Sequence, residues 1–126
     1  MTGRLVAMDR RRSFAISGLA GFVLLAISGC HSAYVEAVVR NDSGAAVSLV
    51  ELDYPSASFG TETLAAGGEY HYRFKILGNG PTKVIWTDSA RQEHTVAGPE
   101  LQEGLQGRLT VALSAASATW NTQLHR

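Results

Sequence analysis

Several residue types on which small domains often depend are scarce in this sequence. The 126 residues contain one cysteine, so an internal disulfide framework and a cysteine-rich zinc site are both excluded. Neither sign of charge is in excess, because 11 lysines and arginines balance 11 aspartates and glutamates. A nucleic-acid binder with a basic footprint is therefore not indicated. The length limits the chain to one ordinary domain and excludes a multidomain enzyme.

The balanced total conceals an uneven distribution of charge along the chain. Four basic residues and one acid precede Cys30, whereas seven basic and ten acidic residues occur from Cys30 onward. A hydrophobic content of 45% is too high for a disordered chain. The part that follows Cys30 is thus a mildly acidic folded segment, with no reason from its net charge to bind a polyanion.

The first 29 residues have the layout of a secretory signal peptide. Arginines at positions 10–12 precede an uncharged run over residues 13–29, and small residues stand directly before Cys30. As a helix this run would extend about 26 Å, slightly short of a comfortable membrane span. We therefore expect a removable signal helix, with a permanent helical anchor as the alternative.

Residues 27–30, with the sequence Ile-Ser-Gly-Cys, resemble the lipobox of bacterial lipoproteins. The resemblance implies cleavage between Gly29 and Cys30, followed by attachment of acyl chains such as palmitate at the Cys30 thiol. Two or more chains anchor a protein stably in a membrane. His31 stands where an aspartate retains lipoproteins at the inner membrane in the best-known sorting systems, so we expect the outer membrane in a cell that has two.

Two features of the N-terminal segment leave alternatives open. Residues 11–14, Arg-Arg-Ser-Phe, resemble the twin-arginine export motif, so the twin-arginine and the general secretory routes both fit. Met8 as the true start would give a more typical signal length than Met1.

After residue 32 the sequence consists of short apolar runs separated by turn-forming residues, which is typical of β-structure. The expected strands cover residues 33–40, 46–54, 58–64, 69–77, 82–87, 93–97 and 107–113, with turns at 41–44, 66–68, 78–81 and 98–99. This order of strands and turns resembles immunoglobulin-like and fibronectin type III-like modules of bacterial envelope proteins, which implies a fold and not an activity. We therefore expect an all-β, about seven-stranded antiparallel immunoglobulin-like β-sandwich after the signal helix.

Alternation of apolar and polar residues predicts which side chains face the core. In the strand at 69–77, one face carries Tyr70, Tyr72, Phe74 and Ile76, and the other carries His71, Arg73 and Lys75. The first and last strands alternate in the same way, with Val35, Ala37, Val39, Leu109, Val111 and Leu113 on their core faces.

The predicted organisation has four parts. Residues 1–29 form the signal peptide, 30–32 the lipidated N-terminus and a short linker, 33–113 the β-sandwich domain and 114–126 a disordered tail. Trp120 is expected to be an incidental apolar residue of that tail.

The sequence contains no convincing catalytic or metal-binding pattern. It lacks a Gly-x-Ser-x-Gly elbow and a Ser-x-x-Lys pair, and none of its four histidines is spaced from another as a local metal pair would be. We therefore expect no enzyme, no cofactor and no metal site.

Two sets of residues remain as candidate ligand surfaces. Tyr54 and Phe59 flank a connection that would suit a peptide, glycan or partner sheet, although both rings would equally cap the core. His71, Arg73 and Lys75 form a basic stripe suited to an anionic ligand, for which a solvated face is the simpler interpretation.

The sequence thus predicts a membrane-anchored envelope lipoprotein that acts as a non-catalytic binding or structural module. Its expected partners are membrane lipid, through acylated Cys30, and an envelope protein or glycan, but no nucleic acid. The alternative is a periplasmic ligand carrier or metal-handling protein in which His71 and His94 meet across strands.

Overall fold

A computed structural model describes residues 33–126, which form eight β-strands. The strands are β1 (Val35–Asn41), β2 (Val47–Tyr54), β3 (Ala57–Leu64), β4 (Glu69–Phe74), β5 (Gly80–Thr87), β6 (Glu93–Leu101), β7 (Gln106–Leu113) and β8 (Ala118–His125). The expectations for the signal peptide and for lipidation at Cys30 lie outside the described residues. Within residues 33–126, no helix has the length and apolar character needed to cross a membrane.

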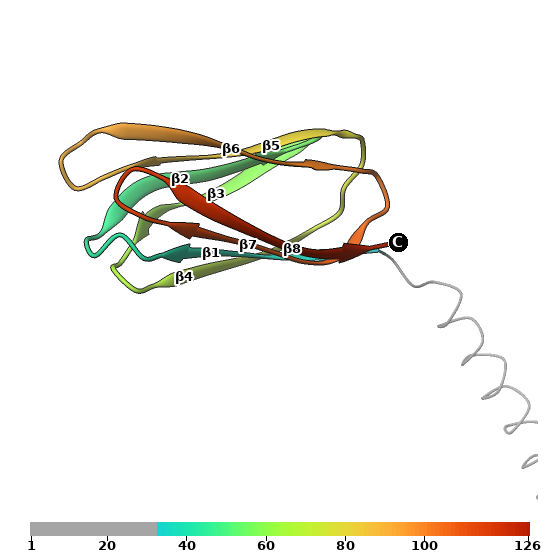
Figure 1. Ribbon diagram of the computed structural model, residues 1–126, viewed down its shortest axis with the longest axis horizontal. Helices are drawn as coiled ribbons and strands as arrows, with labels where there is room; N and C mark the ends of the chain where they lie inside the picture. Colours follow the sequence, from blue (N-terminus) through green and yellow to red (C-terminus); the bar gives the residue numbers. More distant parts are fainter. Residues whose placement is uncertain (1–32) are drawn as a thin grey trace, which may run out of the picture. The chain divides into compact units, whose positions relative to one another are not determined.

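The strands form two four-stranded sheets that stack as layers (Figure 1). Sheet A has the strand order β4-β1-β7-β8, and sheet B has the order β3-β2-β5-β6. The predicted all-β sandwich is confirmed. It differs from the expectation in having an eighth strand in the described region, and in the parallel pairing of β1 with β7 among otherwise antiparallel neighbours.

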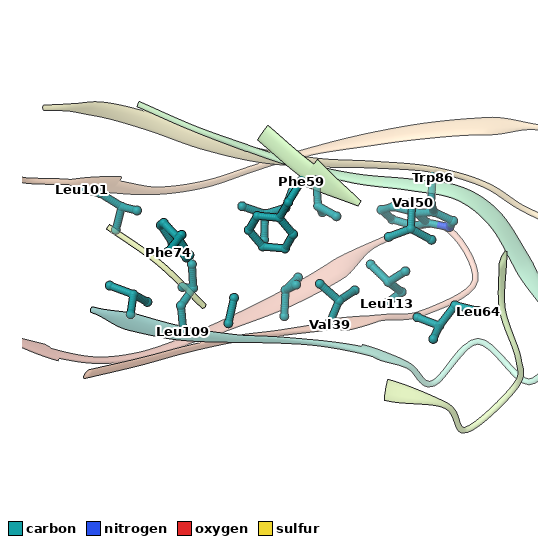
Figure 2. Packing of buried hydrophobic residues seen from close by; sticks show 14 of the residues in the cluster. Val39, Val50, Phe59, Leu64, Phe74, Trp86, Leu101, Leu109 and Leu113 are labelled. Carbon is teal, nitrogen blue, oxygen red and sulfur yellow. The ribbon is translucent and has the colours of Figure 1, made fainter. Parts of the chain in front are cut away.

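The core lies between the sheets because strands from both direct alternate apolar side chains inward (Figure 2). The most completely buried large side chains are those of Trp86, Leu52, Leu101, Leu109, Leu113, Val35, Val39, Val84 and Val111. The alternation predicted for the first and last strands of the expected sandwich is confirmed. In β4 and the residues just after it, Phe74 and Ile76 are buried as predicted, whereas Tyr72 remains 40% exposed because β4 is an edge strand.

The C-terminal residues form β8, so the prediction of a disordered tail at 114–126 is wrong. β8 pairs with β7 in antiparallel register, with Trp120 opposite Val111. Ala118, Trp120 and Leu124 are partly buried against the core, and alternate residues between them are polar. The expectation that Trp120 is incidental is also wrong, because its ring docks on the domain.

The predicted turn at 98–99 is likewise wrong, because Gly98 and Pro99 lie within β6. The register between β5 and β6 shifts between Pro81 and Lys83, so an irregularity in the ladder accommodates this Gly-Pro pair. The predicted turns at 41–44 and 66–68 do occur, and Gly44 and Gly67 adopt φ values of 88° and 74° there.

A buried asparagine holds two of these turns together. The side chain of Asn41 is fully buried, and its Nδ2 donates to the carbonyl oxygens of Ala45, Leu64 and Ala65 at 2.8, 3.0 and 3.1 Å. Its Oδ1 accepts hydrogen bonds from the backbone N and the Oγ of Ser43. The β1–β2 and β3–β4 connections are therefore fixed to each other through one side chain.

Candidate functional site

The outer face of sheet A carries an ordered array of mostly polar side chains, as the strand registers imply. Its three successive rows across β4, β1, β7 and β8 are Arg73-Glu36-Arg108-Gln123, His71-Val38-Thr110-Asn121 and Glu69-Arg40-Ala112-Thr119. Side chains in one row are neighbours on the same face of a sheet. The array thus joins residues from both ends of the described chain.

The predicted basic stripe lies on this face and is exposed as expected, but acidic neighbours accompany its charges. The Nε2 of His71 lies 3.0 Å from the Oε1 of Glu69. The Nε of Arg73 lies 3.6 Å from the Oε1 of Glu36. Exposed pairs of this kind contribute little to stability, yet they reduce the positive potential that His71 and Arg73 present to an anion.

An aromatic ring beside the stripe provides a further contact for two of its cations. The guanidinium carbon of Arg73 lies 4.1 Å from the centre of the Tyr34 ring, and the Nζ of Lys75 lies 5.7 Å from it. Both distances are within the range of cation–π attraction. Arg73 is therefore held by a carboxylate and by an aromatic face.

An open groove of about 370 Å³ crosses the other half of the same face. It is lined by Arg40, Arg108, Thr110, Ala112, Thr119, Asn121 and Gln123. None of these lining residues is acidic. The short side chains of Thr110 and Ala112, at successive outward positions of β7, leave room between the longer flanking side chains.

The two arginines of the groove differ in their partners. The Nε of Arg40 donates to both carboxylate oxygens of Asp42, at 3.1 and 3.0 Å, which leaves its terminal nitrogens without a partner among residues 33–126. Arg108 forms neither an ion pair nor a side-chain hydrogen bond within the described part of the chain. Both therefore have guanidinium donors directed to solvent or to a ligand.

The sequence candidates Tyr54 and Phe59 belong to an aromatic cluster at one end of the core. Phe59 is 7% exposed, and its ring centre lies 4.4 Å from that of Tyr72. The ring of Tyr54 lies 4.2 Å from that of Phe74, and burial raises the pKa of the Tyr54 hydroxyl. Because these rings contact one another, the structure favours the core-capping interpretation over a gripping loop.

The two histidines of the metal-handling alternative are not brought together. His71 lies on β4 and His94 on β6, which are edge strands of different sheets. Each has its own acidic neighbour, and the Nε2 of His94 lies 2.8 Å from the Oδ2 of Asp88. In the part of the chain that the structure describes, no group of three or more histidine, cysteine, aspartate or glutamate residues is arranged to hold a metal ion.

The outer face of sheet B has the opposite electrostatic character. Its carboxylates are those of Glu51, Asp53, Glu62, Glu93 and Glu100, beside the single cation that the described strands place there, Lys83. A hydrogen bond to Asp53, together with its negative charge, raises the pKa of Glu51. The Nζ of Lys83 lies 3.8 Å from the Oδ2 of Asp53.

Sequence analysis did not identify the groove as a candidate site. Alternation already placed Arg108, Thr110 and Ala112 on the outer face of their strand. The other side of the groove is formed by β8. Because sequence analysis assigned the residues of β8 to a disordered tail, it predicted no neighbours for Thr119, Asn121 and Gln123. The alternation of polar residues with Trp120 in this segment was the available signal.

Comparison with known proteins supports the fold and gives no indication of activity. No family model and no curated protein matches this chain. A solved structure, described as the NMR structure of the protein from Eubacterium rectale, is similar with a TM-score of 0.51. The similarity covers 75% of this chain and 91% of that chain at 12% sequence identity. It therefore shows a shared β-sandwich fold and nothing further.

Proposed function

We propose that this protein is a lipid-anchored binding module of the bacterial cell envelope, without catalytic activity, and that the outer face of sheet A is its binding surface. The observation that carries the binding proposal is the groove on that face, whose two arginines have donors free of partners among the described residues. The anchoring proposal rests on the resemblance of residues 27–30 to a lipobox that ends in the single cysteine of the chain.

The strand arrangement is compatible with attachment through Cys30. Four residues lie between Cys30 and Val35, the first residue of β1, and the five extended steps from Cys30 to Val35 reach about 18 Å at most. The start of β1 and the end of β8 lie at the same end of the sandwich, because Val35 pairs with Gly107, which in turn pairs with Leu124. The binding face, which runs along the strands, would then extend outward from the membrane.

The acyl chains would provide the membrane affinity. Each buried methylene contributes roughly 0.8 kcal/mol, so two or three chains hold a small domain stably where a single chain holds it reversibly. In a cell with two membranes, we place the protein at the outer membrane.

Intact-mass analysis of the protein extracted from native membranes tests the anchor. We expect a chain that begins at Cys30 and carries the added mass of acyl chains. Cys30→Ala should abolish both changes, whereas Ser28→Ala, which keeps a small residue near the cleavage site, should preserve them. An uncleaved chain without added mass would contradict the anchor. Fractionation of inner and outer membranes tests the location.

A further inference from the structure

The outer faces of the two sheets carry opposite charge, which the net charge of the chain conceals. On and beside the outer face of sheet A lie the cations Arg40, Arg73, Lys75 and Arg108, together with the carboxylates of Glu36, Glu69 and Asp42. The outer face of sheet B presents the five carboxylates described above and Lys83. An anionic ligand is therefore attracted to sheet A and repelled from sheet B, although acids outnumber bases in the domain.

Within the outer face of sheet A, the groove is the place where the fewest carboxylates of the protein compete with an anion for the arginines. Glu69 on β4 lies 3.0 Å from His71, and Glu36 on β1 lies 3.6 Å from Arg73, although Glu36 is also the register neighbour of Arg108. On the β7–β8 side, Arg108 has no acidic partner among residues 33–126. A ligand in the groove can thus contact a guanidinium without displacing an existing ion pair.

The two arginines lie toward opposite ends of the groove. Arg108 is in register with Glu36, four residues before Arg40 along β1. At about 3.3 Å per residue, the two positions are separated by roughly 13 Å along the strands. A ligand that engages both must therefore be elongated and carry acidic groups at more than one place.

The side chains between the arginines can donate and accept hydrogen bonds. Thr110, Thr119, Asn121 and Gln123 make no side-chain hydrogen bond within the described residues, so their hydroxyl and amide groups remain available. The lining contains no aromatic ring and, apart from Ala112, no apolar residue. This composition is unsuited to an apolar ligand and complements a chain of hydroxyl groups.

We propose that this groove binds an acidic oligosaccharide, whose carboxylate or phosphate groups contact Arg40 and Arg108 while its hydroxyls contact Thr110, Thr119 and Asn121. This inference deepens the proposed function and rests on it, since it names the ligand class of the same face. Because the groove is open and exposed to solvent, binding of one short oligosaccharide is weak and depends on ionic strength.

Calorimetric titration of the full-length protein in detergent micelles tests the inference. We expect heat of binding with tetragalacturonic acid and none with maltotetraose, a neutral oligosaccharide of the same number of sugar units. Arg108→Gln and Arg40→Gln should each lower the affinity about three- to tenfold. Arg91→Gln, in the β5–β6 turn and away from this face, is the matched control and should leave the affinity unchanged. Added salt should weaken binding by the wild-type protein.

Four results would overturn the inference. Equal binding of maltotetraose would show that the acidic groups are not recognised. Inorganic phosphate that binds as tightly as tetragalacturonic acid would indicate a simple anion site. A preference for phosphatidylglycerol vesicles over phosphatidylcholine vesicles that Arg108→Gln abolishes, without saccharide binding, would indicate a lipid surface. A protein shown by mass to be lipidated but unable to bind the saccharide overturns this inference and leaves the anchor intact.

Discussion

Gly98 of β6 lies directly against the indole ring of Trp120 of β8, so closely that a Cβ at position 98 would come within 2.6 Å of both Cε2 and Cζ2 of that ring. β6 and β8 are the edge strands of sheets B and A on the same side of the sandwich. The contact therefore joins the two layers at an edge, where few other residues connect them.

Gly98→Ala should destabilise the domain by about 1–3 kcal/mol, because the added methyl group must displace both the Thr82 hydroxyl, which lies closest to the new Cβ, and the large ring of Trp120. Thermal or urea unfolding measures the effect. Gly78→Ala is the matched control: its added Cβ would meet only the Cβ of Pro55, at 4.0 Å, and should change stability little. Equal stabilities of the two variants would contradict this packing of Trp120.

Removal of β8 by truncation after Ser117 should abolish cooperative unfolding or leave the protein insoluble. Sheet A would lose its edge strand, and the core would lose the cover provided by Trp120 and Leu124. Circular dichroism during heating shows the difference. Truncation after His125, which keeps β8, should melt like the full chain. A shortened protein that also melts normally would restore the disordered-tail interpretation.

Asn41→Ala should cost about 2–4 kcal/mol, because the substitution removes a buried side chain that satisfies three carbonyl oxygens and one backbone N–H. Asn79 provides a graded comparison. Its Oδ1 accepts one exposed hydrogen bond from the backbone N of Glu103, so Asn79→Ala should cost about 0.5–1 kcal/mol. Chemical denaturation distinguishes the two, and a smaller loss for Asn41→Ala than for Asn79→Ala would disprove its anchoring role.

Lowering the pH should destabilise the fold at the β5–β6 turn, because it protonates Asp88. A hydrogen bond with His94 and backbone donors from Gln92 and Ala90 lower the pKa of this carboxyl group. The ionised form is favoured in the fold, so its stabilising effect is complete above the ordinary aspartate pKa of about 3.9. The effect is lost as pH falls through the lower pKa of the folded state.

Melting temperatures measured between pH 2 and pH 6 test this linkage. Asp88→Ala should melt below the wild type at pH 6, and the difference should shrink toward pH 2. Ser89→Ala, in the same turn, should retain the wild-type dependence on pH. A constant difference between Asp88→Ala and wild type at every pH would show that ionisation of Asp88 does not contribute.

The strands of the expected sandwich were predictable from local patterns, because each buries one face. The segment at 69–77 shows this clearly, since its aromatic residues alternate with His71, Arg73 and Lys75. Alternation failed where the backbone departs from a regular ladder. In β2, Leu49 has a φ of 50° and is 66% exposed, next to a shift in register with β5.

Pairing between distant strands was not predictable from local patterns. The residues of β8 become a strand because β7 supplies hydrogen-bond partners and the edge of β6 supplies a surface for Trp120. Small residues at 114–118 concealed this from a local interpretation. The groove depends on the same pairing, since Arg40 and Gln123 come together only when β1, β7 and β8 are adjacent.

The parallel pairing of β1 with β7 also sets the order in which the molecule can be completed. β1 is synthesised first among the described strands, yet one of its two edges stays unpaired until β7 follows every strand of sheet B. Pairings between distant parts of a chain form slowly, because a long loop must lose conformational entropy before the strand contacts can stabilise it. No N-terminal fragment can therefore finish sheet A. Sheet A is therefore completed last, when β7 and β8 join β1 and β4 after all four strands of sheet B have been synthesised.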